Sequence, residues 1–300
     1  MNHGPYLCAA LLCAAGLTAN AASWGAGFEL PPLEQPASDE HHAGKVIWAD
    51  LVTPDLQQAE QFYGELFGWT FQAVTGDPHY ALALLDGEAV AGLSQRSVPQ
   101  GQHRQPAWLT FISVPDVDAT GRLLTAHGGK VLSQPKTYPQ RGRQAVFEDP
   151  DGAVFAVLAS SSGDPADELA DPGQWIWSSL LVKNPDQESA FYSALFGYDV
   201  FTLPSSDGSK HLILSSDDYA RVGLTALPGD KLRRHPHWLN FVRVADAQAA
   251  SAKAVALGGR VLVAPRVDLH GGKLAGIADP SGAPVGLMEW AEGESPQEPK

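Results

Sequence analysis

The chain has 300 residues, 44% of them hydrophobic and 18% charged, which are the proportions of a globular protein. This length is too great for one ordinary core and suits two domains of about 120 residues each. The 20 basic and 34 acidic residues give a formal net charge of −14. Because such a surface repels phosphate and the sequence has no basic run, we expect no nucleic-acid partner.

The first 21 residues have the pattern of an export signal. Residues 6–17 form an apolar run of about a dozen residues, too short to span a bilayer as a helix. The run is followed by Ala-Asn-Ala at 19–21, a small-x-small pattern that a signal peptidase cleaves. A buried structural helix is the alternative, but nothing amphipathic in the run supports it. We therefore predict a signal peptide over residues 1–21 and a secreted or periplasmic protein, with no membrane attachment after cleavage.

The segments outside the predicted domains have simple compositions. The only two cysteines, Cys8 and Cys13, lie in the predicted signal, so the mature chain would have no disulfide, thiolate nucleophile or cysteine metal site. Residues 22–44 are rich in proline and predict a flexible leader. The polar residues 292–300 predict a disordered tail.

An internal repeat organises the rest of the chain. FYGELFGW at 62–69 recurs as FYSALFGY at 191–198, and three further segments recur in the same order. These are PAWLTF at 106–111 with PHWLNF at 236–241, HGGKVL at 127–132 with LGGRVL at 257–262, and FEDPDGAVF at 147–155 with IADPSGAPV at 277–285. The stretch between the copies is rich in Ser, Asp, Pro and Gly and predicts a linker over residues 160–174.

Each copy divides again into two similar halves. Residues 46–52 alternate as a strand does, Asp55 is a candidate N-cap of a helix, and Gly68 ends that helix. Strand patterns follow at 80–85 and 88–94. The second half repeats this order as strand 108–114, a helix capped by Asp116 or Asp118 and stopped at Gly128-Gly129, and strands 130–133, 144–148 and 154–158.

Strand, helix and three strands, twice per copy, resemble the vicinal-oxygen-chelate superfamily of glyoxalases, bleomycin-resistance proteins and extradiol dioxygenases. The FYGELFGW, AWLTF, HGGKV and DPDGAVF segments carry the resemblance. It implies an α+β fold of four βαβββ units, arranged as two glyoxalase-like domains with cupped mixed sheets. The predicted domains are residues 45–159 and 175–291.

The resemblance also implies metal-ligand positions on the first and last strands of each unit. Metal-dependent members carry His or Glu there, which leaves coordination sites open for substrate oxygens. The corresponding residues here are Trp48, Gly92, Leu109 and Ala156 in the first copy and Trp177, Gly223, Leu239 and Gly286 in the second. None can bind a cation through its side chain, so we expect no metal and no cofactor. A divalent ion elsewhere stays an alternative, and His235 with His237 is the candidate pair for it.

Two carboxylates are weak catalytic candidates. Asp50 lies two residues beyond Trp48 and therefore points to the same face of its strand. A charge that points inward from a central strand is costly unless it is paired. Glu148 is the second candidate. In the other copy Ser179 replaces Asp50, so we expect the two cups to be unequal.

Matched aromatic and basic residues are candidates for ligand binding. Trp48 matches Trp177 and Trp108 matches Trp238, and such aromatic side chains either pack in the core or line a dry pocket. Arg143 matches Lys273, and each either clamps an anionic group or reaches to water. The predicted ligand-binding residues are Trp48, Asp50, Trp108, Phe111, Arg143, Trp177, Ser179, Trp238, Phe241 and Lys273.

Three functions agree with these residues. The first is a metal-independent binding or accessory protein for a small molecule, aromatic or anionic, acting as a monomer or homodimer. The second is an enzyme, a lyase, isomerase or dioxygenase of the glyoxalase type with an unconventional metal or acid/base site. The third is a protein with closed cups that acts through surface contacts in a complex.

Overall fold

The structure is a computed structural model, and the residues that it describes are 29–97, 106–203, 210–227, 235–267 and 272–290. The predicted signal peptide and the predicted tail lie outside these ranges. Within them, no helix is long and apolar enough to cross a membrane.

Two eight-stranded mixed sheets form the framework of the described chain. The first has the order β2-β3-β4-β1-β5-β8-β7-β6 and the second has the order β10-β11-β12-β9-β13-β16-β15-β14. The strands of domain 1 are β1 (Val46–Thr53), β2 (Thr70–Val74), β3 (Asp77–Leu85), β4 (Glu88–Gln95), β5 (Ala107–Ser113), β6 (Lys130–Tyr138), β7 (Gly142–Glu148) and β8 (Val154–Ser160). Those of domain 2 are β9 (Trp175–Val182), β10 (Asp199–Leu203), β11 (His211–Ser216), β12 (Tyr219–Ala226), β13 (His237–Arg243), β14 (Arg260–Val267), β15 (Lys273–Ala278) and β16 (Pro284–Met288).

One helix belongs to each βαβββ unit, and each begins at a side-chain cap. The helices are α1 (Leu56–Phe67), α2 (Val117–Ala126), α3 (Pro185–Phe196) and α4 (Ala247–Ala256). Asp55 accepts a hydrogen bond from the backbone N–H of Gln58, as its N-cap position predicts. At the second helix the cap is Asp116 rather than Asp118, which lies in the first turn. Gly68 ends α1 in the left-handed conformation, at φ 81°.

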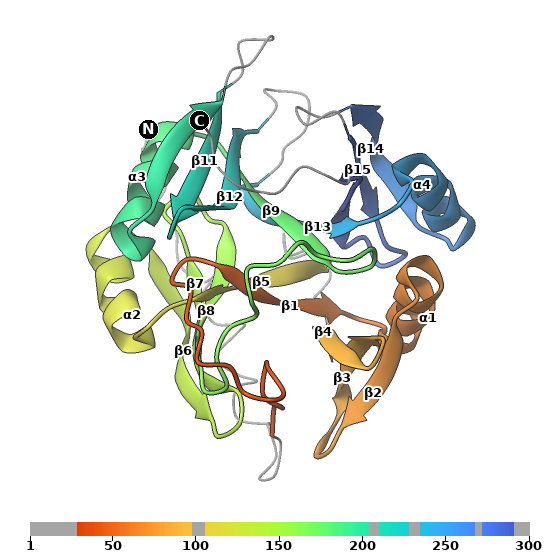
Figure 1. Cartoon of the computed structure of the whole chain (residues 1–300), viewed down its shortest axis with the longest axis horizontal. Helices are drawn as coiled ribbons and strands as arrows, with labels where there is room; N and C mark the ends of the chain where they lie inside the picture. The colour runs from red at the N-terminus through yellow and green to blue at the C-terminus, as the bar shows by residue number, and fades with distance from the viewer. Residues whose placement is uncertain (1–28, 98–105, 204–209, 228–234, 268–271, 291–300) are drawn as a thin grey trace, which may run out of the picture.

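The four units therefore form the predicted α+β fold. The short edge strand β2, which the sequence patterns had not indicated, completes the first unit. In each sheet the two units meet where an antiparallel pair joins β1 to β5 or β9 to β13. The concave faces of the two sheets point away from each other, towards the bottom and the top of Figure 1. We call the concave side of the first sheet cup 1 and that of the second sheet cup 2.

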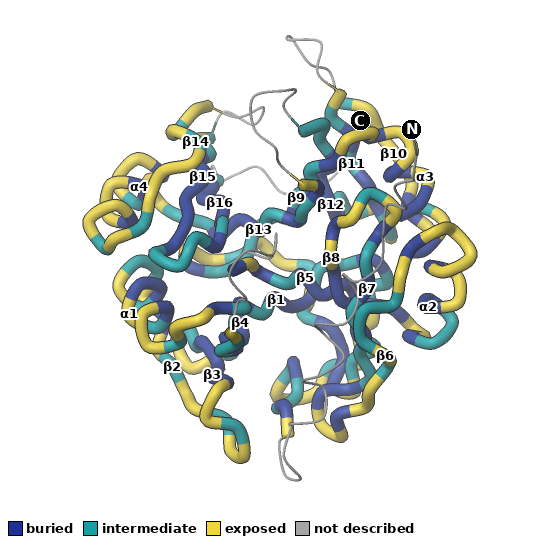
Figure 2. The backbone as a smooth tube through the Cα atoms, turned by 180° about the vertical axis from the view of Figure 1, so that it is seen from behind, coloured by how far each residue is buried: buried dark blue, intermediate teal, exposed yellow. Residues whose placement is uncertain are grey.

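The convex sides of the sheets pack against each other and against the helices. Helices α1 and α4 lie on one flank, and α2 and α3 lie on the other (Figure 1). Two large apolar clusters each combine residues of both domains, so the domains share their cores. The middle strands are buried, whereas the outward sides of the helices are exposed (Figure 2). At the centre, Asn240 Oδ1 accepts hydrogen bonds from Thr110 Oγ1 at 3.1 Å and Ser178 Oγ at 2.8 Å.

Two of the repeated sequence motifs hold the domains together. The hydroxyl of Tyr63, in the FYGELFGW segment, donates a hydrogen bond at 3.1 Å to Asp279 in the DP turn of the other domain. In the reverse direction, Tyr192 donates to Asp149 at 3.0 Å. Each aspartate also accepts backbone N–H groups of its own turn through Oδ1, so both of its carboxylate oxygens accept hydrogen bonds.

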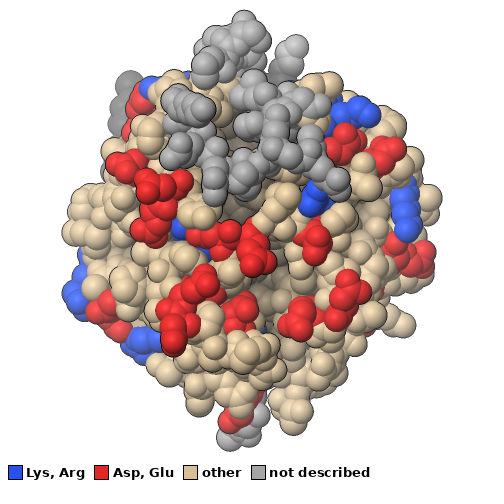
Figure 3. Space-filling model, in the orientation of Figure 1, with Lys and Arg blue, Asp and Glu red and all other residues tan. Residues whose placement is uncertain are grey.

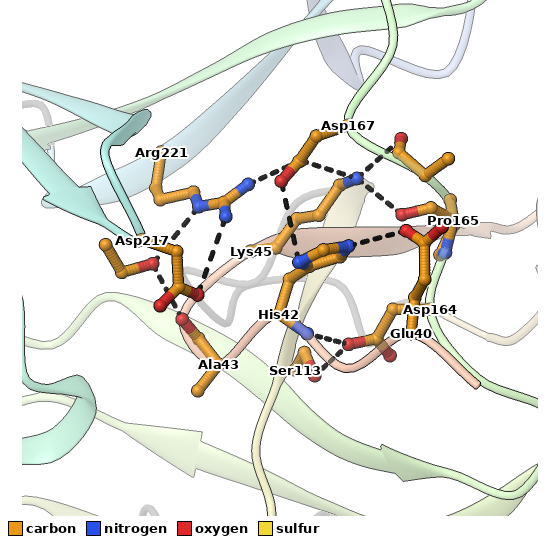
Figure 4. Close-up of polar contacts among 12 residues, drawn as sticks. Glu40, His42, Ala43, Lys45, Ser113, Asp164, Pro165, Asp167, Asp217 and Arg221 are labelled. Carbon is orange, nitrogen blue, oxygen red and sulfur yellow. Dashed lines mark hydrogen bonds and ion pairs between the residues drawn. The ribbon is translucent and has the colours of Figure 1, made fainter.

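The leader differs from the expectation over residues 29–44. We predicted a flexible segment, but Leu30 and Leu33 are only 4% and 8% exposed. A polar network also fixes the end of the leader (Figure 4). There Asp167 contacts Lys45 at 2.8 Å and Arg221 of domain 2 at 2.5 Å. The composition of the leader did not reveal this packing because its partners lie more than a hundred residues away in the sequence.

The exposed surface agrees with the net negative charge. Acidic side chains gather on the face shown in Figure 3, where the leader and the linker cross the front of the molecule. Burial alone would raise the pKa of Asp167, but Arg221 and Lys45 together hold it below its usual value. This carboxylate therefore stays charged and joins the leader, the linker and domain 2.

Candidate functional site

A buried polar cluster lies at the floor of cup 1. Asp50 projects from β1, and its Oδ1 accepts hydrogen bonds from Trp48 Nε1 at 2.7 Å and from the Tyr80 hydroxyl at 2.8 Å. Burial raises the pKa of Asp50 above its usual value, although these two hydrogen bonds and the charge of Arg141 oppose that rise. The carboxylate is thus held by two neutral donors in a largely apolar cup.

Arg141 covers this cluster from the turn between β6 and β7. Its side chain is 1% exposed, and its guanidinium carbon lies 4.3 Å from the centroid of the Trp48 ring. Its Nε donates a hydrogen bond at 2.7 Å to the carbonyl oxygen of Pro31. Among the described residues, no atom accepts a hydrogen bond from its Nη2. Arg141 is therefore a buried cation with unused hydrogen-bonding capacity.

The leader packs into cup 1. Leu30 and Leu33 belong to an apolar cluster with residues of the cup wall. The described members of that wall are Ile47, Trp48, Tyr80, Leu82, Phe111, Tyr138, Ala156 and Leu158. The backbone N–H of Leu33 donates to Ser162 Oγ at 2.9 Å, which fixes the segment to the linker. Cup 1 thus contains part of its own chain.

Cup 2 has the same framework with different contents. Trp177 Nε1 donates to Ser179 Oγ at 3.1 Å, as Trp48 does to Asp50. His211 occupies the position in cup 2 that Tyr80 has in cup 1. On its own strand, each of these residues lies two positions before the residue that pairs with the equivalent glycine of the neighbouring strand. Trp177 is partly exposed, whereas Trp48 is 6% exposed. Aromatic surface in cup 2 therefore remains accessible to a ligand.

Six of the predicted ligand-binding residues face the cups. They are Trp48, Asp50 and Phe111 in cup 1 and Trp177, Ser179 and Phe241 in cup 2. Strand register explains this grouping, because Trp48 pairs with Phe111 and Trp177 pairs with Phe241.

The other two tryptophans were wrongly placed in the binding site. Trp108 and Trp238 belong to the shared convex cores. Trp108 Nε1 donates to the Tyr63 hydroxyl at 3.1 Å, and the Trp238 ring packs edge-on against Tyr192 at 5.6 Å. Trp108 lies an odd number of residues from Phe111 on β5, so its side chain points to the opposite face.

The predicted basic clamps also lie away from the cups. Arg143 binds Asp118 of α2 through two hydrogen bonds of 2.6 and 2.8 Å, on the helix side of the sheet. Lys273 lies 4.0 Å from Glu289. Glu148, the second catalytic candidate, pairs with Lys130 at 2.6 Å at the sheet edge. Within the described structure, only Asp50 among the predicted charged residues faces a cup.

The residues at the implied metal positions do not fit a divalent ion. The four positions of each cup carry tryptophan, glycine, leucine or alanine, which offer no side-chain donor to a metal. A Cβ added at Gly92 would lie 2.0 Å from Asp50 Oδ1 and from the Tyr80 hydroxyl, and one added at Gly286 would lie 2.1 Å from the Phe241 ring. A ligating side chain therefore has no room at either glycine. Elsewhere in the described ranges, no group of three or more His, Cys, Asp or Glu residues is placed to hold a metal.

Sequence reasoning missed Tyr80, Arg141 and the leader. A signal for Arg141 was present in the repeat, because the first copy has Asp50 and Arg141 where the second has Ser179 and Gly271. Two opposite charges that disappear together suggest that the two side chains act on each other.

The fold and the cups define a class of protein: tandem βαβββ domains with concave mixed sheets. Domain 1 matches the model of the Glyoxalase/Bleomycin resistance protein/Dioxygenase superfamily over residues 41–157, and domain 2 matches a Glyoxalase-like domain over residues 178–288. The chain belongs to this superfamily, which confirms the resemblance seen in its sequence.

Two relatives match most of the chain. "Putative glyoxylase CFP32" of Mycobacterium tuberculosis is 32% identical over 259 residues, which cover 85% of this chain and 98% of the relative. "Anthracycline biosynthesis protein DnrV" of Streptomyces peucetius is 32% identical over 268 residues, which cover 83% of this chain and 94% of the relative. The matches therefore include both domains.

Solved structures share the arrangement at low sequence identity. The Mn(II)-bound glyoxalase from Novosphingobium aromaticivorans has a TM-score of 0.60 at 16% identity and covers 83% of this chain and 82% of its own. The 2,3-dioxygenase LapB from Pseudomonas sp. KL28 has a TM-score of 0.59 at 14% identity, with coverages of 87% and 97%. At these identities the likeness shows the fold alone.

Proposed function

We propose that the chain is an exported, metal-independent binding or accessory protein of the superfamily, and that it takes a small aromatic or anionic molecule into cup 2. The observation that carries the proposal is the content of the eight implied ligand positions. They hold no donor, and at Gly92 and Gly286 neighbouring side chains occupy the space that a donor would need. The concave scaffold is thus retained, while the eight positions that the resemblance implies offer no side-chain ligand to a metal.

The walls of cup 2 support an aromatic ligand. Trp177 presents a partly exposed indole, and Phe241, 7% exposed, packs beside it against Gly286. Flat rings stack well on such surfaces, and removal from water contributes most of the binding free energy. Ser179 and His211 supply polar groups that orient a ligand.

Two measurements test this proposal. Metal analysis of the purified protein should find no stoichiometric Zn, Ni, Mn or Fe, and a stoichiometric metal would refute metal independence. Titration with small aromatic compounds, including an anthracycline because of the name of one relative, should quench tryptophan fluorescence saturably. The matched variants are Trp177→Leu and Trp48→Leu. The first should abolish the response and the second should preserve it, because Trp48 is covered by the leader.

Export rests on residues 1–21 alone. Expressed with its own amino terminus in a bacterial host, the protein should be recovered from the periplasm or the medium with Ala22 as its first residue. An unprocessed chain in the cytosol would contradict this part of the proposal. Size-exclusion chromatography with light scattering should show a monomer or a homodimer.

A second candidate function is a glyoxalase-type lyase, isomerase or dioxygenase. The observation that favours it is Asp50, a carboxyl group of raised pKa among Trp48, Tyr80 and Arg141. Raised carboxyl pKa values in concave sites are typical of general acids and bases. Turnover of glyoxalase or ring-cleavage substrates that Asp50→Asn abolishes, with Ser179→Ala as the matched control in cup 2, would favour this function over simple binding.

A further inference from the structure

The segment of residues 30–33 occupies cup 1 in the manner of a ligand. Leu30 and Leu33 are buried against Trp48, Phe111 and the other wall residues, and the segment belongs to no strand or helix. In Figure 1 the leader, in red, runs along the opening of the first sheet. The apolar side chains of the segment thus cover the concave face of cup 1, whereas the equivalent face of cup 2 is partly exposed.

Arg141 contacts the segment through one hydrogen bond. Its Nε binds the Pro31 carbonyl, while its Nη2 is buried and has no acceptor among the described residues. A guanidinium presents a planar fork that matches two oxygens of a carboxylate or sulfonate. The single Pro31 carbonyl therefore uses only part of the hydrogen-bonding capacity of the Arg141 guanidinium.

The rest of the cluster favours the same kind of occupant. Arg141 lies over the Trp48 ring, so an anion held by the guanidinium would have an aromatic surface beside it. Asp50 acts on Arg141 through its charge alone, since no hydrogen bond or ion pair within 4.0 Å joins the two described side chains, and Asp50 Oδ1 accepts from Trp48 and Tyr80. The guanidinium remains charged despite its burial, since arginine is protonated at all physiological pH values.

The second copy lacks this arrangement. Gly271 replaces Arg141 in the sequence, and Ser179 replaces Asp50. A cation at this position is therefore specific to domain 1 and does not follow from the architecture that both domains share. A fold that only needed to close cup 1 could do so with apolar side chains at a smaller desolvation cost.

We propose that cup 1 is a site for an apolar ligand with a carboxylate or sulfonate group, which Arg141 binds, and that residues 30–33 are its built-in competitor. This inference rests on the proposed binding function and adds a second, regulated site with a defined ligand chemistry. The ligand enters when the segment leaves, its charged oxygens replace the Pro31 carbonyl on Arg141, and its apolar body replaces the two leucines.

The test uses 8-anilinonaphthalene-1-sulfonate, which joins an aromatic body to a sulfonate and becomes fluorescent in apolar sites. In the full chain, Leu30→Ser/Leu33→Ser should raise the affinity for this probe at least about tenfold, because two buried leucines no longer compete. Leu262→Ser, which changes an exposed leucine of β14, is the matched control and should leave the affinity unchanged. Adding Arg141→Gln to the double variant should reverse the gain by about tenfold.

A peptide in trans provides a test that no destabilised variant can mimic. The peptide ELPPLEQP, residues 29–36, should displace the probe from the double variant, and the same peptide with both leucines changed to serine should not. If Arg141→Gln fails to fold, as thermal melting and near-ultraviolet circular dichroism would reveal, Arg141→Lys replaces it, and this change should also weaken probe binding.

The outcomes separate this inference from the proposed function of cup 2. No gain of affinity in the double variant, or a gain that ELPPLEQP does not compete away, overturns the inference on cup 1. A gain that Arg141→Gln leaves intact overturns the role of Arg141. Loss of binding in Trp177→Leu, measured separately in the wild-type background, concerns cup 2 alone, so either proposal can fail without the other.

Discussion

Glu188 provides a sharp test of how burial acts in this interface. It lies on α3, is fully buried, and neither carboxylate oxygen has a hydrogen-bond partner among the described residues. Burial, together with the charges of Asp149 and Asp151, raises its pKa from 4.5 to about 8, while Lys183 acts in the opposite direction. At the equivalent position of α1, 129 residues earlier, the other interface has Ala59. We therefore consider the change Glu188→Ala, which makes the two interfaces alike.

The expected effect depends on pH. The folded pKa is higher than the unfolded one, so the folded state is favoured by protonation, and its disadvantage grows as the pH rises from about 4.5 towards 8. The rise of the Glu188 pKa from 4.5 to about 8 lowers the free energy of unfolding by at most ~5 kcal/mol above pH 8, because each pKa unit is worth about 1.4 kcal/mol. Local relaxation and water entry reduce this limit, and the lost side-chain packing costs about 1 kcal/mol at every pH. We expect Glu188→Ala to be neutral or slightly destabilising at pH 5 and about 2 kcal/mol stabilising at pH 9.

Urea unfolding at pH 5, 7 and 9 measures this difference directly. Glu188→Gln keeps the side-chain volume and removes only the charge, so it should show the same trend with pH. The reverse change, Ala59→Glu, should destabilise the protein more at pH 9 than at pH 5. A free energy of unfolding for Glu188→Ala that runs parallel to the wild type across this range would refute the reasoning, because it would mean that Glu188 is solvated or paired in the folded state.

Three further predictions concern the cup and the domain interface. Gly92→Ala should destabilise the protein by about 2–3 kcal/mol in thermal unfolding, because its Cβ would lie 2.0 Å from atoms of Asp50 and Tyr80. Gly223→Ala, whose nearest contacts are at 3.0 Å, should lower the stability clearly less. Asp50→Asn keeps an acceptor for both hydrogen bonds and removes a carboxylate whose pKa is raised, so its stability relative to the wild type should increase as the pH rises above the usual carboxyl range. Asn240→Ala removes the shared acceptor of two buried hydroxyls and should lower the free energy of unfolding by about 2 kcal/mol in urea titrations, without changing probe binding in cup 2.

Local sequence patterns determined the architecture. Asp55 and Asp116 cap their helices, and Gly68 ends α1 with a positive φ. These features depend on residues within one helical turn of each other, so the sequence reveals them directly. The same motifs recur in the second half of the chain, and their shared order and spacing predict the four units.

Only the tertiary structure decided which face of each strand lies in a cup and what fills each cup. Trp48 and Trp108 both lie in strands with similar aromatic patterns, but the register of β1 against β5 puts one in cup 1 and the other in the shared core. The leader contacts Arg141 and Ser162, which are more than a hundred residues away, so its composition could not reveal its place. Periodicity reports how a residue relates to its neighbours in one strand or helix. Contacts between distant segments depend on how whole sheets and helices pack, and that packing placed the leader in cup 1.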